Sequence, residues 1–360
     1  MNGTSNLTNH SNDETEKHNF TTMQVFSMAA FSVILFLGSL GNLLVIYVYG
    51  FTGRRRFRKF EKLMLMLGVV DFIASITNPA YFLYRIASRG VWQLGYVPCK
   101  IIPALGPIFT GISLGIILIM AVDRDRAIST PYKNQFHLRT IYKAVFATIV
   151  FSVAITVPYI YHIDIVTYGS EPYCLVDGGV EYNVIVVVIF SFSDVIFLLI
   201  FTTTTVRIFS KLQSKTTAAE NTKSQKQRRQ EKNRILKMIF AMGFMFVLCV
   251  FPRDLLFIAF SIRRIFPPEI PIGNVIDVNN VLKVLHTSNS CVNVFLYSFL
   301  NEKFRVEIIR VVNKSKRIRR SFYDSSFMSS YRSTTSDNHA ENEFIVRNKF
   351  DEQKQLMNAK

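Results

Sequence analysis

Residues 184–201 read VIVVVIFSFSDVIFLLIF and would be apolar on every side of a helix, with Asp194 as the one charged residue. A soluble amphipathic helix has a polar face opposite its apolar one. A helix that crosses a hydrocarbon core of roughly 30 Å needs about 20 mostly apolar residues. This segment therefore predicts a helix that spans a membrane.

The same pattern recurs along the chain and predicts seven spans. Their approximate bounds are Met23–Tyr49, Leu63–Ile86, Pro98–Arg124, Ile141–Tyr161, Tyr182–Phe209, Ile235–Ile262 and Val275–Leu300. The seventh is the most polar, because it carries Asn279, Asn280, Lys283, His286, Asn289 and Asn293. Polar groups that face lipid are costly, so this face should point into the bundle. We expect an all-α membrane protein, a seven-transmembrane helix bundle.

The overall composition agrees with this class. Hydrophobic residues make up 49% of the 360 residues, which excludes disorder throughout, and four cysteines are too few for a disulfide scaffold. The excess of 42 Lys and Arg over 25 Asp and Glu favours a nucleic acid or an anionic membrane surface as partner. Since the basic residues fall in short loops between apolar spans, we expect membrane lipids and no nucleic acid.

The distribution of Lys and Arg predicts the orientation of the spans. Basic residues gather between spans one and two, after span three, between spans five and six, and after span seven. The alternate connections are nearly bare, and no Lys or Arg occurs between Tyr159 and Glu181. Positive residues mark the cytoplasmic side. The N-terminus is therefore expected outside the cell and the C-terminus inside.

The segments outside the spans are expected to differ in character. Residues 1–22 form an extracellular tail whose N-x-S/T sequons predict glycosylation at Asn2, Asn6, Asn9 and Asn19. The tail lacks the pattern of a cleaved signal peptide. Residues 23–300 form the seven-span domain, residues 301–313 an amphipathic eighth helix on the inner leaflet, and residues 314–360 a disordered cytoplasmic tail.

Two of the four cysteines are predicted to form a disulfide. Cys99 lies at the outer end of the third span and Cys174 in the loop between spans four and five, so both face the oxidising side. Two free thiols are the alternative. Cys249 and Cys291 fall inside spans and are expected to be packing residues.

Motifs in six places resemble those of rhodopsin-like (class A) G-protein-coupled receptors, over roughly residues 25–310. The matching residues are Asn42 in GNLLVIYV, Asp71 in LMLGVVD, Trp92 and Gly95 before Cys99, Asp123, Arg124, Ala127, Ile128 and Pro131 in AVDRDRAISTP, Phe246, Cys249 and Pro252 in the sixth span, and Asn289, Ser290, Asn293 and Tyr297 in NSCVNVFLY, followed by Phe304. The resemblance implies a receptor that binds an extracellular ligand and activates a heterotrimeric G protein.

The resemblance implies two functional groups inside the bundle. One is a pocket for Na⁺ built from Asp71, Ser113, Asn289, Ser290 and Asn293; a water-filled polar network without an ion is the alternative, and no other cofactor or metal is expected. The other is an inner switch formed by Asp123, Arg124, Pro252 and Tyr297. Asp123 would hold Arg124 at rest, and an outward swing of the sixth span would release Arg124 toward the G protein.

The chain also departs from the family pattern. Val250 replaces the tryptophan of the sixth-span motif, Val294 the proline of the seventh, and Asp125 the tyrosine that follows Arg124. Lys232 stands near the place of a Glu that often pairs with that arginine. These changes keep the fold but put in question how activation is transmitted.

The outer half of the bundle is the expected ligand pocket. Gly106 stands where amine receptors carry an Asp, and Thr287 where opsins carry the retinal Lys, which disfavours amines and light. The expected pocket residues are Gly106, Arg253, Asp254, Phe257, Lys283 and His286. Two cations and one carboxylate suit a ligand with an anionic end, such as a short peptide. The alternative is that Arg253 and Asp254 only neutralise each other.

The sequence thus predicts a plasma-membrane peptide receptor that is not an enzyme. Hydroxyl-rich residues in the tail would bind arrestin once phosphorylated, and a tail that only keeps the chain soluble is the alternative. The alternatives are a decoy receptor that binds ligand without signalling and a seven-span transporter, which usually shows inverted repeats.

Overall fold

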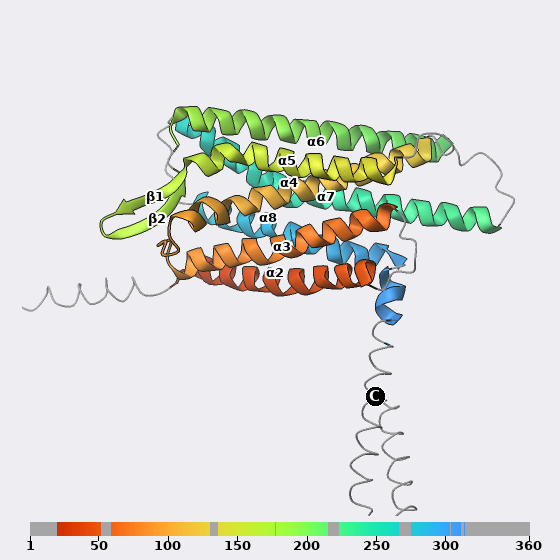
Figure 1. The fold of residues 1–360 in the computed structure, drawn as a ribbon, viewed down its shortest axis with the longest axis horizontal. Helices are drawn as coiled ribbons and strands as arrows, with labels where there is room; N and C mark the ends of the chain where they lie inside the picture. The colour runs from red at the N-terminus through yellow and green to blue at the C-terminus, as the bar shows by residue number, and fades with distance from the viewer. Residues whose placement is uncertain are drawn as a thin grey trace, which may run out of the picture. The chain divides into compact units, whose positions relative to one another are not determined.

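Seven long helices occupy the seven expected spans in the part of the chain that the structure describes. The structure is a computed structural model and describes residues 20–51, 59–129, 136–176, 178–214, 223–265, 275–302, 304–310 and 313. The elements are α2 (Thr22–Ile46), η1 (Tyr47–Phe51), α3 (Lys59–Ala87), α4 (Tyr96–Ser129), α5 (Leu138–His162), β1 (Ile163–Tyr168), β2 (Glu171–Val176), α6 (Val180–Ser214), α7 (Lys223–Ile265) and α8 (Val275–Leu300). The helices run alongside one another (Figure 1). Helices α2 to α8 are therefore spans one to seven.

The first span begins at a capping box. Thr21 Oγ1 accepts a hydrogen bond of 3.2 Å from the Gln24 backbone N–H, and the Gln24 side chain accepts one of 2.9 Å from the Thr21 N–H. These bonds satisfy backbone donors that have no partner inside the helix. The helix continues into a π-helical turn, η1, before the first inner loop.

Six of the helices are long and apolar enough to cross a membrane, with mean hydropathies from 1.6 to 2.9 over their most apolar windows. They are α2 with η1, α3, α4, α5, α6 and α7. Helix α8 does not meet this criterion because of its Asn, Lys and His residues. It packs against α2, α3 and α7. Its buried polar side chains, among them His286 and Asn293, lie inside the bundle as expected for the seventh span.

A β-hairpin follows α5, which the sequence analysis did not predict. Strands β1 and β2 pair antiparallel, with Tyr168 opposite Glu171. The two-residue turn begins at Gly169, whose φ is +66°. A positive φ at the first turn position alone is the pattern of a type II′ turn, and glycine adopts it without strain. The alternation in IDIVTY and the Gly-Ser turn were the available signals.

The hairpin is fastened to the outer ends of α3 and α4. The Cys99–Cys174 disulfide is present, which confirms the predicted pairing. Trp92 donates its backbone N–H to the Pro172 carbonyl at 2.7 Å and packs with Cys99, Cys174 and Ile163 in one buried cluster. The hairpin lies at the end of the bundle where α2 begins (Figure 1).

The chain divides into two compact units, Met1–Phe304 and Arg305–Lys360. In the first, Phe304 is fully buried between the rings of Tyr49 and Tyr297, at centroid distances of 5.9 and 6.1 Å. In the second, residues 305–310 are helical, and Arg310 pairs with Glu307. The four sequons and the tail 314–360 lie outside the described residues.

The disulfide closes a separation of 75 residues, so its loss should destabilise the outer end of the receptor. We expect Cys99→Ser, Cys174→Ser and the double variant to lower the free energy of unfolding by the same amount, about 2–4 kcal/mol. Thermal unfolding of purified receptor measures this. A reducing agent should destabilise the wild type and leave the three variants unchanged; additive losses in the double variant would contradict the pairing.

Candidate functional site

The carboxylate of Asp71 is the centre of a buried polar network. Asp71 on α3 has 1% of its surface exposed. Its Oδ1 accepts a hydrogen bond of 2.5 Å from Ser113 Oγ on α4, and its Oδ2 accepts one of 2.8 Å from Asn293 Nδ2 on α8. Three helices therefore meet at one carboxylate, as charged groups inside a membrane bundle require.

A second part of the network joins the first helix to the seventh. Asn42 Nδ2 on α2 donates to the Ser290 carbonyl on α8 at 2.9 Å and lies 3.4 Å from Ser75 Oγ. Ser75 in turn donates to the Asp71 backbone carbonyl at 2.6 Å. The motif search found Asn42, but Ser75 carries no motif, so only the fold places it here.

Two other expected members lie nearby with different contacts. Asn289 and Ser290 are both buried, at 6% and 5% exposure. The Ser290 hydroxyl donates to the Thr287 carbonyl at 3.1 Å. Two buried oxygens, Asn42 Oδ1 and the Tyr297 hydroxyl, have no hydrogen-bond partner among the described residues. Such atoms are the usual sites for ordered water or an ion.

The inner end of α4 holds the Asp123–Arg124 pair. The Arg124 guanidinium lies 2.8 Å from Asp123 Oδ2, and the Asp123 side chain is only 6% exposed. The guanidinium also lies over the Phe60 ring of α3, at 5.1 Å from its centroid. Arg124 is therefore held by its neighbour and by an aromatic face, at the position where the sequence predicted a switch.

Two further ion pairs at this end were not predicted. Asp125, which departs from the family motif, is buried and lies 4.0 Å from Arg207 of α6. Arg234 of α7 pairs with Glu302, just after α8. Both partners of the second pair are half exposed, so its net contribution is small. Together these pairs link α4 to α6 and α7 to the end of α8.

The residues that replace the family motifs are well packed. Val250 and Val294 are buried at 2% and 8% exposure. A Cβ on Gly41 of α2 would come within 2.7 Å of Val294, so the two helices approach closely there. Helix α8 contains no proline, whereas Pro252 interrupts the hydrogen-bond ladder of α7.

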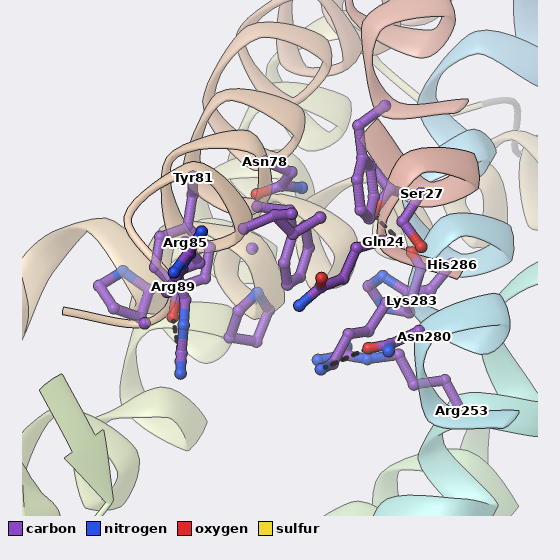
Figure 2. Close-up of a pocket in the computed structure, with 18 of the residues that line it drawn as sticks. Gln24, Ser27, Asn78, Tyr81, Arg85, Arg89, Arg253, Asn280, Lys283 and His286 are labelled. Atoms are coloured by element: carbon purple, nitrogen blue, oxygen red, sulfur yellow. Dashed lines mark hydrogen bonds between the residues drawn. The ribbon is translucent and has the colours of Figure 1, made fainter. Parts of the chain in front are cut away.

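A cavity of about 580 Å³ opens at the outer end of the bundle. Residues from α2, α3, α4, α5, α7 and α8 line it, together with the turn after α3. Figure 2 shows Tyr81, Arg85 and Arg89 on one side and Asn280, Lys283, His286 and Arg253 on the other, with Gln24 and Ser27 beside them. Its volume is in the range of small-ligand pockets.

The cavity brings together four of the six expected pocket residues. Gly106, Arg253, Lys283 and His286 line it. Asp254 and Phe257 do not line it, because they lie on the face of α7 toward α6. The Phe257 ring contacts Phe190 of α6 at a centroid distance of 5.5 Å, and the Asp254 carboxylate is acted on by the charge of Arg253 and, less strongly, by that of Asp194 on α6.

The structure adds cations that the sequence analysis did not place in the pocket. Arg85, at the outer end of α3, and Arg89, in the turn after it, line the cavity. Arg85 Nη1 donates to the Tyr81 hydroxyl at 3.2 Å, and Arg89 lies over the Phe20 ring. Only Arg85 falls within the predicted span Leu63–Ile86, and Arg89 follows it, so the sequence offered no signal beyond basic residues near the end of a helix.

A bundle of seven spans with a disulfide-tied outer hairpin, an outer cavity and an inner Asp-Arg pair defines a seven-transmembrane receptor. Comparison of the sequence with known protein families agrees with this class. The family model "7 transmembrane receptor (rhodopsin family)" matches residues 41–297. The chain therefore belongs to the rhodopsin family of seven-transmembrane receptors.

Similar proteins include receptors for several ligands. The chain is 26% identical to galanin receptor 2b of Danio rerio over 296 residues, which is 81% of this chain and 75% of the relative. It is 27% identical to the fMet-Leu-Phe receptor of Homo sapiens over 308 residues, 81% and 84% of the two chains. It is 22% identical to C-C chemokine receptor type 6 of Homo sapiens over 323 residues, 84% and 80%.

Family membership fixes the general activity. The chain is a G-protein-coupled receptor, not an enzyme, and transmits the binding of an extracellular ligand to heterotrimeric G proteins. Its seven helices form a transmembrane bundle.

Proposed function

We propose that this receptor acts at the plasma membrane and responds to an extracellular peptide. The observation that carries the proposal is the polar outer cavity of about 580 Å³, positively charged and bounded by six helices. Such a cavity accepts the end of a peptide, while the hairpin and the extracellular tail can contact the remainder. The names of galanin, formyl peptide and chemokine receptors among the relatives support a peptide.

Activation is a shift between two populations of the bundle. A ligand that binds more tightly to the form with α7 swung outward raises the population of that form. Pro252 provides the hinge, because its missing N–H weakens the helix there. Movement of α7 would separate Arg234 from Glu302 and give the G protein access to Arg124.

Two further partners belong to this proposal. The hydroxyl-rich segment of residues 321–337 would bind arrestin after phosphorylation. Basic residues that follow α8, such as Arg305 and Arg310, would contact anionic lipids of the inner leaflet.

Cells that express the chain with a promiscuous G-protein reporter should respond to at least one member of a peptide library. Arg124→Ala should lower that response at least about tenfold, because in the proposed active form the arginine is released from Asp123 and would contact the G protein. Binding of labelled peptide and surface expression should stay unchanged in this variant. These two measurements are the control for its folding and its delivery to the cell surface.

Other outcomes favour the alternatives. Uptake of labelled peptide with arrestin recruitment but without any G-protein response would show a decoy receptor. Silence toward all peptides, with a response to a lipid or an amine, would overturn the peptide ligand.

We also propose that the Asp71 network holds Na⁺. A hard monovalent cation prefers oxygen ligands, and Asp71 Oδ1 and Ser113 Oγ lie 2.5 Å apart with lone pairs available. The unpartnered Asn42 Oδ1 is another oxygen in the same network. A bound cation would supply the positive charge that compensates the buried carboxylate of Asp71.

Purified receptor should unfold at a temperature roughly 2–4 °C higher in Na⁺ than in K⁺ at the same ionic strength. Asp71→Asn should abolish the difference, because it removes the charged ligand. Asp194→Asn, which changes another carboxylate inside a span, is the matched control and should keep the difference. An equal sodium effect in wild type and Asp71→Asn would reject the site.

A further inference from the structure

The outer cavity collects positive charge from three helices. Arg85 of α3, Arg253 of α7 and Lys283 of α8 line it. Figure 2 shows Arg85 across the cavity from Lys283 and Arg253. Because all three line the same cavity, the charges of Arg85 and Arg253 also act on Lys283, and the three cations form one site.

The described part of the chain compensates little of this charge. Among the described residues, no carboxylate forms a salt bridge within 4.0 Å of Arg85, Arg253 or Lys283. No Asp or Glu occurs among the described residues that line the cavity. Asp254 follows Arg253 on α7 and offsets part of its charge. Counting Arg85, Arg253 and Lys283 alone, and leaving aside Arg89 of the lining, three cations less the one neighbouring carboxylate leave about two positive charges.

The hydrogen-bond donors of these cations are also mostly unused. Arg85 donates to the neutral Tyr81 hydroxyl at 3.2 Å, and Lys283 lies 3.5 Å from the neutral Asn280 Oδ1. A guanidinium has five N–H donors and an ammonium three, so several remain for a ligand. Cations that are partly withdrawn from water without a charged partner bind an anion strongly.

We propose that the cavity binds a ligand portion that carries at least two negative charges, either two carboxylates or one sulfate or phosphate ester. This inference rests on the proposed ligand-binding role of the same cavity and specifies the chemistry that it selects. A single carboxylate would leave one of the three cations without a counter-charge. In a peptide, the C-terminal carboxylate together with an acidic side chain meets the requirement.

Small anions test the inference without a known agonist. The probes are the potassium salts of malonate, glutarate and sulfate, with acetate as the monoanion, at constant ionic strength. Thermal unfolding of the full-length purified receptor is followed by a thiol-reactive dye, since Cys249 and Cys291 are free and buried in the folded state. A dianion should raise the unfolding midpoint saturably, whereas acetate should not.

Charge-removing variants identify the site. Arg253→Gln and Lys283→Gln should each raise the anion concentration for half of the effect by about 10- to 100-fold. Arg253→Lys, which keeps the charge, should retain the response and shows that the Gln variant fails through charge rather than folding. Arg264→Gln changes an exposed arginine of α7 that does not line the cavity, so it should behave as the wild type.

The pattern of responses also separates the sources of charge. A shift with malonate or glutarate alone indicates a pair of carboxylates, and a shift with sulfate alone indicates a sulfate or phosphate ester. The inference is overturned if no dianion stabilises the receptor, if acetate acts equally, or if Arg264→Gln abolishes the effect as Arg253→Gln does. Because this assay uses neither agonist nor G protein, it can fail while the peptide response stands, and the reverse also holds.

Discussion

The hydrocarbon core of a membrane offers no hydrogen bonds, and this constraint governs the positions of the polar side chains in the bundle. Backbone groups are satisfied within each helix, but a buried carboxylate such as Asp71 needs donors from neighbouring helices. Ser113 and Asn293 supply them, so α3, α4 and α8 meet at one point. Asn42 extends the contact to α2. The polar network thus determines which faces of four helices point inward.

The same constraint explains the two ends of the bundle. At the inner end, Asp123 and the Phe60 ring hold Arg124. At the outer end, helices converge on a cavity in whose described lining Arg85, Arg253 and Lys283 have no acidic partner. A ligand that supplies the missing negative charge would reduce the electrostatic repulsion between the cations at the outer ends of these helices. The helices run from the outer to the inner end of the bundle and would carry that change with them. Helix α7 contains Pro252, the proposed hinge of this movement.

Much of the fold could be predicted from the sequence because the determining signals are local. Continuous apolar runs predict spans, basic loops predict orientation, and the compartment of Cys99 and Cys174 predicts their bond. The hairpin was missed because a short alternating segment beside a glycine turn, residues 163–176, gives a weak signal next to long apolar runs. The cavity was only partly predicted. Arg85 lines the cavity because of the way α3 packs against the other helices, and Asp254 does not line it because of the rotation of α7 about its axis. A local sequence pattern encodes neither of these features.

The central claim is that the chain crosses the bilayer an odd number of times, with ligand cavity and switch on opposite sides. Epitope tags at the two ends of the full chain, probed by antibody on intact and on permeabilised cells, test it most directly. The account predicts that the N-terminal tag is labelled on intact cells and the C-terminal tag only after permeabilisation. Equal labelling of both tags on intact cells would contradict it.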